Sequence, residues 1–213
     1  MQVDTLFGQT DFRFGFKGGY SLSTQYGITP KDLEYTVDSF FRHAFAGGMI
    51  FDFGITESFG IQQEFLYVQK GSRQDIGIPD EDVTTHVEYD LNYFEIPIVF
   101  HYTFIHLGNF KIYGAGGYVM SIMLSGEVRL DGIAIVDGSE AYFTYKTDME
   151  GVDIFDYSFL YGAGVEFPLF GFNSFLEYRF TIGWNTLEMP TFPDEPPAPL
   201  RNQSYNFTFG MYF

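Results

Sequence analysis

Aromatic side chains recur at every second residue through most of the chain, and this spacing constrains the fold more than any other feature. Near the C-terminus, Tyr205, Phe207 and Phe209 alternate with small or polar residues. Successive side chains of a β-strand point to opposite faces of the sheet, so strict alternation predicts strands. Eight segments follow the pattern: 11–22, 44–55, 59–70, 91–102, 110–124, 157–167, 174–185 and 204–213. The sequence therefore predicts an all-β chain, organised as one domain over residues 1–213.

Charged residues within these segments fall on the face opposite the aromatic side chains. The set comprises five acids and five bases: Arg13, Lys17, Asp52, Glu64, Lys70, Glu95, Lys111, Glu166, Glu177 and Arg179. Ten glycines share that face. In a soluble barrel the aromatic face would form the core, but Phe and Tyr on every strand would overfill a small interior. The pattern instead favours aromatic side chains in contact with lipid around a narrow lumen of small residues and neutralised charges.

A sheet that crosses lipid has to close on itself, because hydrocarbon cannot hydrogen-bond an open edge. We therefore predict a closed antiparallel eight-stranded transmembrane β-barrel. The predicted connections alternate between short ones, at 56–58, 103–109 and 168–173, and long ones, at 23–43, 71–90, 125–156 and 186–203. Outer-membrane barrels have short periplasmic turns and longer extracellular loops, which places the four long connections outside the cell.

The long connections carry most of the acidic excess of a chain whose net charge is −17. Residues 125–156 alone hold eight acids against two bases. This sign of charge argues against nucleic acid as a partner. The absence of cysteine excludes a disulfide framework, a zinc–thiolate site and a thiol nucleophile. Residues 1–4 lack the basic and apolar features of a leader, so we expect a mature chain in the outer membrane of a Gram-negative bacterium.

Four stretches, taken in order along the chain, carry a resemblance to a known family. They are Phe14–Tyr20, Gln63–Gly71, Tyr93–Ile98 and Tyr161–Phe167. With them the chain resembles the PorT-like outer-membrane β-barrel proteins, which share the architecture of the small OmpA and OmpX barrels. The resemblance implies a barrel fold and, for some members, a part in a protein-secretion apparatus. The terminal Phe213 is similar to the C-terminal aromatic residue that the barrel-insertion machinery reads.

The ten charges on the strands are the first candidate site. They could form a path for protons or ions, or a structural network that fills and rigidifies a closed lumen. Eight strands leave little room for a pore, so we favour the structural network.

Two acidic stretches are candidates for a hard cation such as Ca²⁺, which prefers oxygen ligands. One stretch comprises Asp80–Asp82 with His86, and the other comprises Asp148, Glu150 and Asp153. Neither has the spacing of an EF-hand. We therefore favour solvated charge without a bound metal.

Two further features are weighed in the same way. The glycine pairs at 114–116 and 162–164 lie inside predicted strands, where they are expected to mark tight packing or bulges rather than phosphate-binding loops. The proline-rich stretch 190–199 stiffens the last long connection. It serves either as a rigid loop presented to a partner or as a cover over the barrel mouth.

The sequence contains neither an HExxH nor a GxSxG motif. We therefore predict a non-enzymatic outer-membrane protein, without catalytic residues, cofactor or metal, that acts as a structural or binding component through its acidic extracellular loops. It would act alone or as a subunit of a larger envelope or protein-secretion assembly. Its expected partners are outer-membrane lipids, the barrel-insertion machinery and other envelope proteins. Two alternatives stay open: a small outer-membrane lipid-modifying enzyme, and a soluble β-barrel carrier of an apolar ligand.

Overall fold

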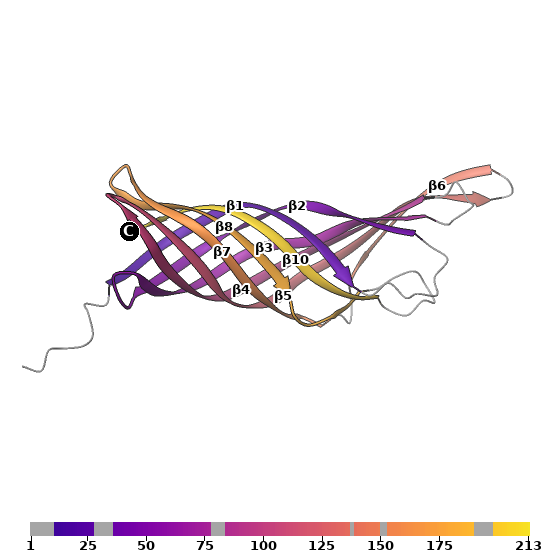
Figure 1. The fold of residues 1–213 in the computed structure, drawn as a ribbon. Helices are drawn as coiled ribbons and strands as arrows, with labels where there is room; N and C mark the ends of the chain where they lie inside the picture. Colours follow the sequence, from indigo (N-terminus) through magenta and orange to yellow (C-terminus); the bar gives the residue numbers. More distant parts are fainter. Residues whose placement is uncertain (1–10, 28–35, 78–83, 137–138, 150–152, 190–197) are drawn as a thin grey trace, which may run out of the picture.

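Eight long antiparallel strands close into a barrel (Figure 1). The computed structural model describes residues 11–27, 36–77, 84–136, 139–149, 153–189 and 198–213. The ring strands are β1 (Asp11–Gly27), β2 (Thr36–Gly54), β3 (Phe59–Gly77), β4 (Thr84–Leu107), β5 (Phe110–Val136), β7 (Phe155–Leu169), β8 (Phe172–Gly183) and β10 (Ala198–Tyr212). Each strand pairs with the next in this order, and β1 pairs with β10 to complete the ring. The predicted eight-stranded antiparallel barrel is confirmed.

Two more strands lie outside the ring. β6 (Ser139–Asp148) folds back antiparallel on the far part of β5, and β9 (Leu187–Met189) pairs with the start of β10. Over the part of the chain that is described, no helix is long and apolar enough to cross a membrane.

The two ends of the barrel differ in how the strands are joined. At one end, here called the turn end, short connections lead from β2 to β3, from β4 to β5 and from β7 to β8, and the C-terminus lies there too (Figure 1). The β7–β8 connection is only Phe170–Gly171, and both residues have positive φ (53° and 87°), as a type I′ hairpin turn requires. The opposite end is called the extended end, because strands project from it well beyond the ring.

The strands at the extended end are longer than the sequence predicted. β4 begins at Thr84 rather than at 91, and β5 continues to Val136 rather than to 124. Much of the predicted connections 71–90 and 125–156 is therefore strand. The projecting parts form one continuous sheet, here called the outer sheet, made of residues 36–43, 71–77, 84–92 and 125–136 together with β6. Figure 1 shows β6 at its far tip.

The two faces of the wall exchange their character along β4, which explains why the strand was underestimated. Near the turn end, Phe100 and Tyr102 face outward and are about half exposed. Beyond Tyr93, the inward side chains become apolar, with Val87 and Leu91 buried. Alternation therefore continues, but the apolar face turns from the outside to the inside. This is the exchange expected where a wall leaves lipid and enters water.

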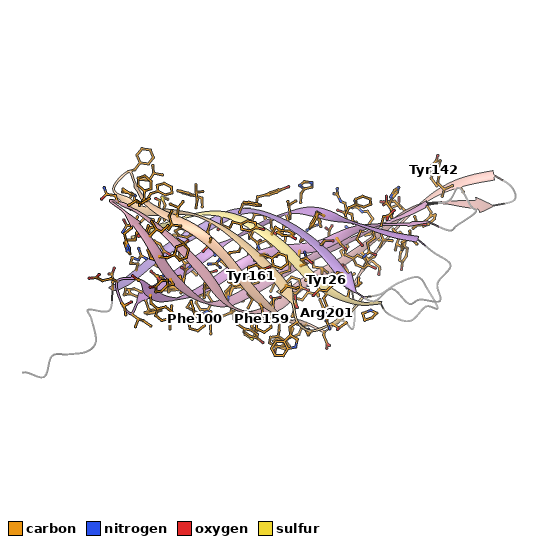
Figure 2. The ribbon with its side chains drawn as sticks, viewed as in Figure 1. Tyr26, Phe100, Tyr142, Phe159, Tyr161 and Arg201 are labelled. Atoms are coloured by element: carbon orange, nitrogen blue, oxygen red, sulfur yellow. The ribbon has the colours of Figure 1, made fainter. Side chains whose placement is uncertain are left out.

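An aromatic belt covers the outside of the ring. Phe100, Phe159 and Tyr161 project from it in Figure 2. Other large apolar side chains that are at least two-fifths exposed include Phe12, Phe16, Phe45, Met49, Phe53, Tyr67, Ile98, Leu176 and Phe207. A continuous apolar surface of this extent exceeds what a monomeric soluble protein leaves in contact with water. The belt therefore faces lipid, and the alternative of a soluble carrier of an apolar ligand is not supported.

The belt gives a first testable prediction. Phe207 lies near the middle of β10 within the belt, so Phe207→Arg would place a charge against hydrocarbon. We expect the free energy of unfolding in lipid vesicles to fall by about 2–4 kcal/mol. Tyr142→Arg is the matched control, because Tyr142 lies on β6 outside the ring and is 81% exposed. Equal effects of the two substitutions would contradict the assignment of the belt to lipid.

Candidate functional site

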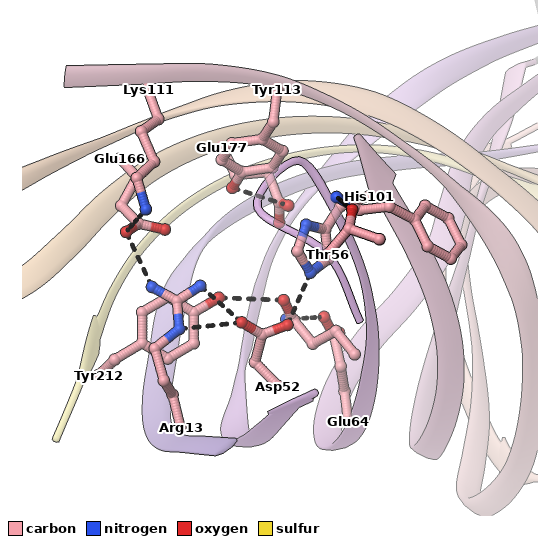
Figure 3. A network of polar contacts seen from close by, with 12 residues as sticks. Arg13, Asp52, Thr56, Glu64, His101, Lys111, Tyr113, Glu166, Glu177 and Tyr212 are labelled. Atoms are coloured by element: carbon pink, nitrogen blue, oxygen red, sulfur yellow. Dashed lines mark hydrogen bonds and ion pairs between the residues drawn. The ribbon is translucent and has the colours of Figure 1, made fainter. Parts of the chain in front are cut away.

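Charged side chains fill the lumen in three layers, and the first lies at the turn end (Figure 3). Arg13 stands between two carboxylates: its Nη2 is 2.5 Å from Asp52 Oδ2 and its Nη1 is 2.8 Å from Glu166 Oε1. His101 Nε2 is 2.6 Å from the other oxygen of Asp52. Lys111 Nζ lies 3.5 Å from Glu166 Oε1 at the edge of the layer. The strands supply these groups because inward positions recur at every second residue.

The second layer is a buried quartet of two bases and two acids: Lys17, Glu64, Glu177 and Arg179. Arg179 holds Glu64 through two hydrogen bonds, of 2.7 and 2.9 Å, in the bidentate geometry that suits a guanidinium and a carboxylate. Lys17 Nζ is 2.8 Å from Glu64 Oε2, and Arg179 Nε is 2.7 Å from Glu177 Oε1. The quartet is neutral, which is the condition under which charges withstand burial.

The third layer surrounds Lys70. Its Nζ is 2.6 Å from Glu95 Oε1 and 3.4 Å from Asp156 Oδ2. Asn202 donates a 2.8 Å hydrogen bond to the same oxygen of Asp156, and the ammonium lies 4.9 Å from the centre of the Tyr93 ring. Asp156 is completely buried. The sequence reasoning missed it, because Asp156 fell in the segment predicted as the third long connection.

Aromatic side chains that point inward separate the first two layers. Phe175 and Tyr212 pack together with Ile50 across the lumen. Space for such rings comes from glycine: a Cβ at Gly210 would lie 2.3 Å from the Phe175 ring, and one at Gly164 would lie 2.4 Å from the Tyr113 ring. Gly164 and Gly210 are therefore positions where an inward ring from a neighbouring strand needs room, whereas a Cβ at Gly15, Gly19, Gly48, Gly117 or Gly162 would meet the main chain of the neighbouring strand.

The lumen ends differently at its two mouths. At the extended end, a cluster of Val87, Tyr89, Leu91, Tyr93, Val128 and Leu187 is buried between the outer sheet and β9. At the turn end there is a cavity of about 440 Å³, lined by the first charged layer and by the two neighbouring turns. The barrel is thus filled with side chains at its centre and hollow at the turn end.

All ten charged residues predicted for the lumen lie in it, and each belongs to an ion pair with a partner from another strand. Lys111 is the most accessible, with 42% of its side chain exposed. The main-chain N–H of Phe213 donates a 2.7 Å hydrogen bond to Phe14 O, and its ring packs on Phe16 and Phe172 at the turn end. The roles predicted for the network and for Phe213 stay predictions.

The other candidate sites fare differently. Asp80–Asp82 and Glu150 lie outside the described residues, and His86 pairs with Asp75 at 2.6 Å. Among the side chains that the structure describes, no group of three His, Cys, Asp or Glu residues is arranged to hold a metal. The glycine pairs at 114–116 and 162–164 lie inside β5 and β7, as predicted. Most of the proline-rich stretch, 190–197, lies outside the described part of the chain.

Comparison with known proteins places this arrangement among known barrels. Residues 7–187 match the family model described as an outer membrane protein beta-barrel domain. The outer membrane protein OprG from Pseudomonas aeruginosa aligns with a TM-score of 0.50 and 13% identity, over 97% of this chain and 98% of that one. The outer membrane protease OmpT from Escherichia coli aligns with a TM-score of 0.51 and 9% identity, over 100% and 99% of the two chains.

Neisserial surface protein A, from Neisseria, aligns with a TM-score of 0.47 and 10% identity, over 94% of this chain and 97% of that one. No curated protein matches the sequence. At these identities the likenesses concern the fold. Because OmpT is a protease, the fold is compatible with an enzyme as well as with a protein that has no catalytic activity.

The quartet gives the second prediction. Arg179→Met would leave Glu64 and Glu177 with Lys17 as their remaining basic partner, and stranding buried charge in this way costs about 3–5 kcal/mol of unfolding free energy. The control is Arg73→Met, because Arg73 pairs with Glu88 at 2.9 Å on the surface and is 54% exposed. There the expected loss is below about 1 kcal/mol. Denaturant titration in lipid vesicles measures both, and similar losses would argue against a structural role for the lumen network.

Proposed function

Since the chain belongs to the outer membrane protein beta-barrel domain family and lies in the outer membrane, we propose that it is a non-enzymatic component that binds a partner through the outer sheet. In this setting the turn end faces the periplasm and the extended end faces the cell exterior. The observation that carries the proposal is the outer sheet itself. Four ring strands continue beyond the barrel and, together with β6, present a surface that the barrel does not need for closure.

The outer sheet has a packed base of its own. Val87, Tyr89 and Leu91 from β4 meet Val128 from β5 and Leu187 from β9, and all five are buried. Burial of this kind holds strands in place once the membrane no longer supports them. A projecting sheet with a core is a rigid platform, which suits the binding of a partner outside the cell.

Charge indicates what kind of partner fits. Side chains described in the outer sheet include seven acids, Asp38, Asp75, Glu88, Asp90, Glu127, Asp131 and Asp148, against four bases, Arg42, Arg73, Arg129 and Lys146. Exposed aromatic residues stand beside them on β6, where Tyr142 is 81% and Tyr145 56% exposed (Figure 2). Aromatic groups within an acidic surface suit a partner with a basic surface.

Two observations support a role without chemistry. The central lumen is filled by the quartet, so it offers no route for a solute through the described residues. His101 is hydrogen-bonded to Asp52, and within the described chain no Ser, Thr or Tyr hydroxyl is hydrogen-bonded to His101. A histidine that activates a nucleophile needs such a contact. The Tyr20 hydroxyl does contact His43 Nδ1, but this pair is exposed on the outer face of the barrel and does not line the lumen. The resemblance to PorT-like proteins implies a part in a protein-secretion assembly. We include such an assembly among the partners that the outer sheet would bind.

The proposal is tested by site-specific photo-crosslinking in intact cells. A benzophenone amino acid at Tyr145 should yield a discrete adduct with an envelope or extracellular protein, whereas the same group at Phe207 should contact only lipid. Asp131→Asn and Asp148→Asn together should lower the yield several-fold without changing barrel stability, because neither carboxylate is buried or belongs to a described ion pair, and the amide introduced by Asp131→Asn keeps an oxygen that can accept from Thr144. Equal adducts at both positions would overturn the proposal. Turnover of a lipid or peptide by the purified barrel would identify an enzyme instead.

A further inference from the structure

The cavity at the turn end opens to the periplasm and is independent of the outer sheet. We propose that it is a binding site for a small organic cation, an amine carried on an apolar body. Its volume of about 440 Å³ falls within the range of sites for small molecules. The β2–β3 turn at Thr56–Ser58 forms one side of its mouth, and His106 with Lys111 from the β4–β5 hairpin forms another. The quartet fills the lumen beyond, so the cavity is blind.

The charge of the lining selects a cation. Its acids are Asp11, Asp52, Glu57 and Glu166, and its permanent bases are Arg13 and Lys111. Asp52 and Glu166 are paired with Arg13, and Lys111 adds to Glu166. None of the ion pairs in the described chain involves Asp11 or Glu57. Counted over these four acids and two bases, the cavity carries two negative charges in excess.

One buried acceptor points into the cavity. Glu166 is nine-tenths buried, and its Oε1 takes both Arg13 and Lys111. Glu166 lines the cavity, and no described residue is paired with its Oε2. A carboxylate oxygen held by buried neighbours and left open toward a cavity is a preorganised acceptor for an ammonium group. Asp52 has no free carboxylate oxygen, because Arg13 is hydrogen-bonded to one and His101 to the other.

The mouth and the walls supply the remaining contacts. Asp11 on β1 pairs with Gly54 on β2, and both residues line the cavity. Phe59 and Tyr113 provide aromatic surface in the lining. Aromatic faces attract cations and also pack on an apolar body. An anion would find the donors of Arg13 already directed at Asp52 and Glu166.

Three probes of one shape and different charge test the inference. The full barrel, in nanodiscs of zwitterionic lipid, is titrated with phenethylamine, 2-phenylethanol and phenylacetate, and binding is followed by calorimetry and by NMR of labelled tyrosines. The amine should bind at least about tenfold more tightly than the alcohol, since hydrogen bonds to charged groups are the strong ones. It should shift the signals of Tyr113 and Tyr212. Binding of none of the three, or preference for phenylacetate, would overturn the inference.

Substitutions locate the binding. Glu166→Gln should weaken the binding of the amine about tenfold. The double variant Asp11→Asn with Glu57→Gln should also weaken it, and it changes exposed side chains only. The test therefore remains valid if the Glu166 variant fails to fold. The matched control removes two acids from the outer sheet, Asp38→Asn and Asp131→Asn, and should leave affinity unchanged. Loss of binding in the control but not in the cavity variants would place the cation on the outer sheet and refute the inference. The photo-crosslinking at Tyr145 is unaffected by either result.

Discussion

The pairing of β1 with β10 is the contact on which the rest of the molecule depends. Thirteen residue pairs, from Gly15 with Tyr212 to Gly27 with Leu200, join the first and last ring strands. In hydrocarbon an unpaired backbone group costs several kcal/mol, so a ring with an open seam would not survive there. Closure also fixes the lumen, because every second residue of each strand must then point to a common axis. The three charged layers follow from that geometry.

The distribution of apolar and charged side chains between the two faces of the strands reverses along their length. Within the barrel, aromatic side chains such as Phe100 lie outside and charged side chains such as Glu95 lie inside. In the outer sheet, Leu91 and Val128 lie inside while Arg73 and Arg129 face water. β4 and β5 both run through the boundary, although their pairing shifts register there, between Asn92 and Tyr93. The exchange of apolar and polar side chains between the two faces allows one set of strands to be both a membrane anchor and a surface platform.

The period-two pattern predicted which residues share a face, and this was enough for the number of ring strands and for the position of the ten lumen charges. It was not enough for Asp156, because that residue lies at the first inward position of β7, beside a segment whose aromatic alternation fades. Nor did it find Phe175 and Tyr113, whose rings lie on the polar face. Gly210 and Gly164, each on a neighbouring strand, leave room for these two rings, and the register that brings ring and glycine together is not visible in one strand's pattern.

The lumen network also constrains how the chain can enter the membrane. Glu64 and Arg179 are 115 residues apart, Arg13 and Glu166 are 153 apart, and Lys17 and Glu177 are 160 apart. A hairpin of two adjacent strands therefore carries charges whose partners lie on strands not yet beside it, and lipid opposes such unbalanced charge. Insertion strand by strand would pass through a series of costly states. The bilayer accordingly favours a barrel that assembles its ring before, or together with, its passage into hydrocarbon.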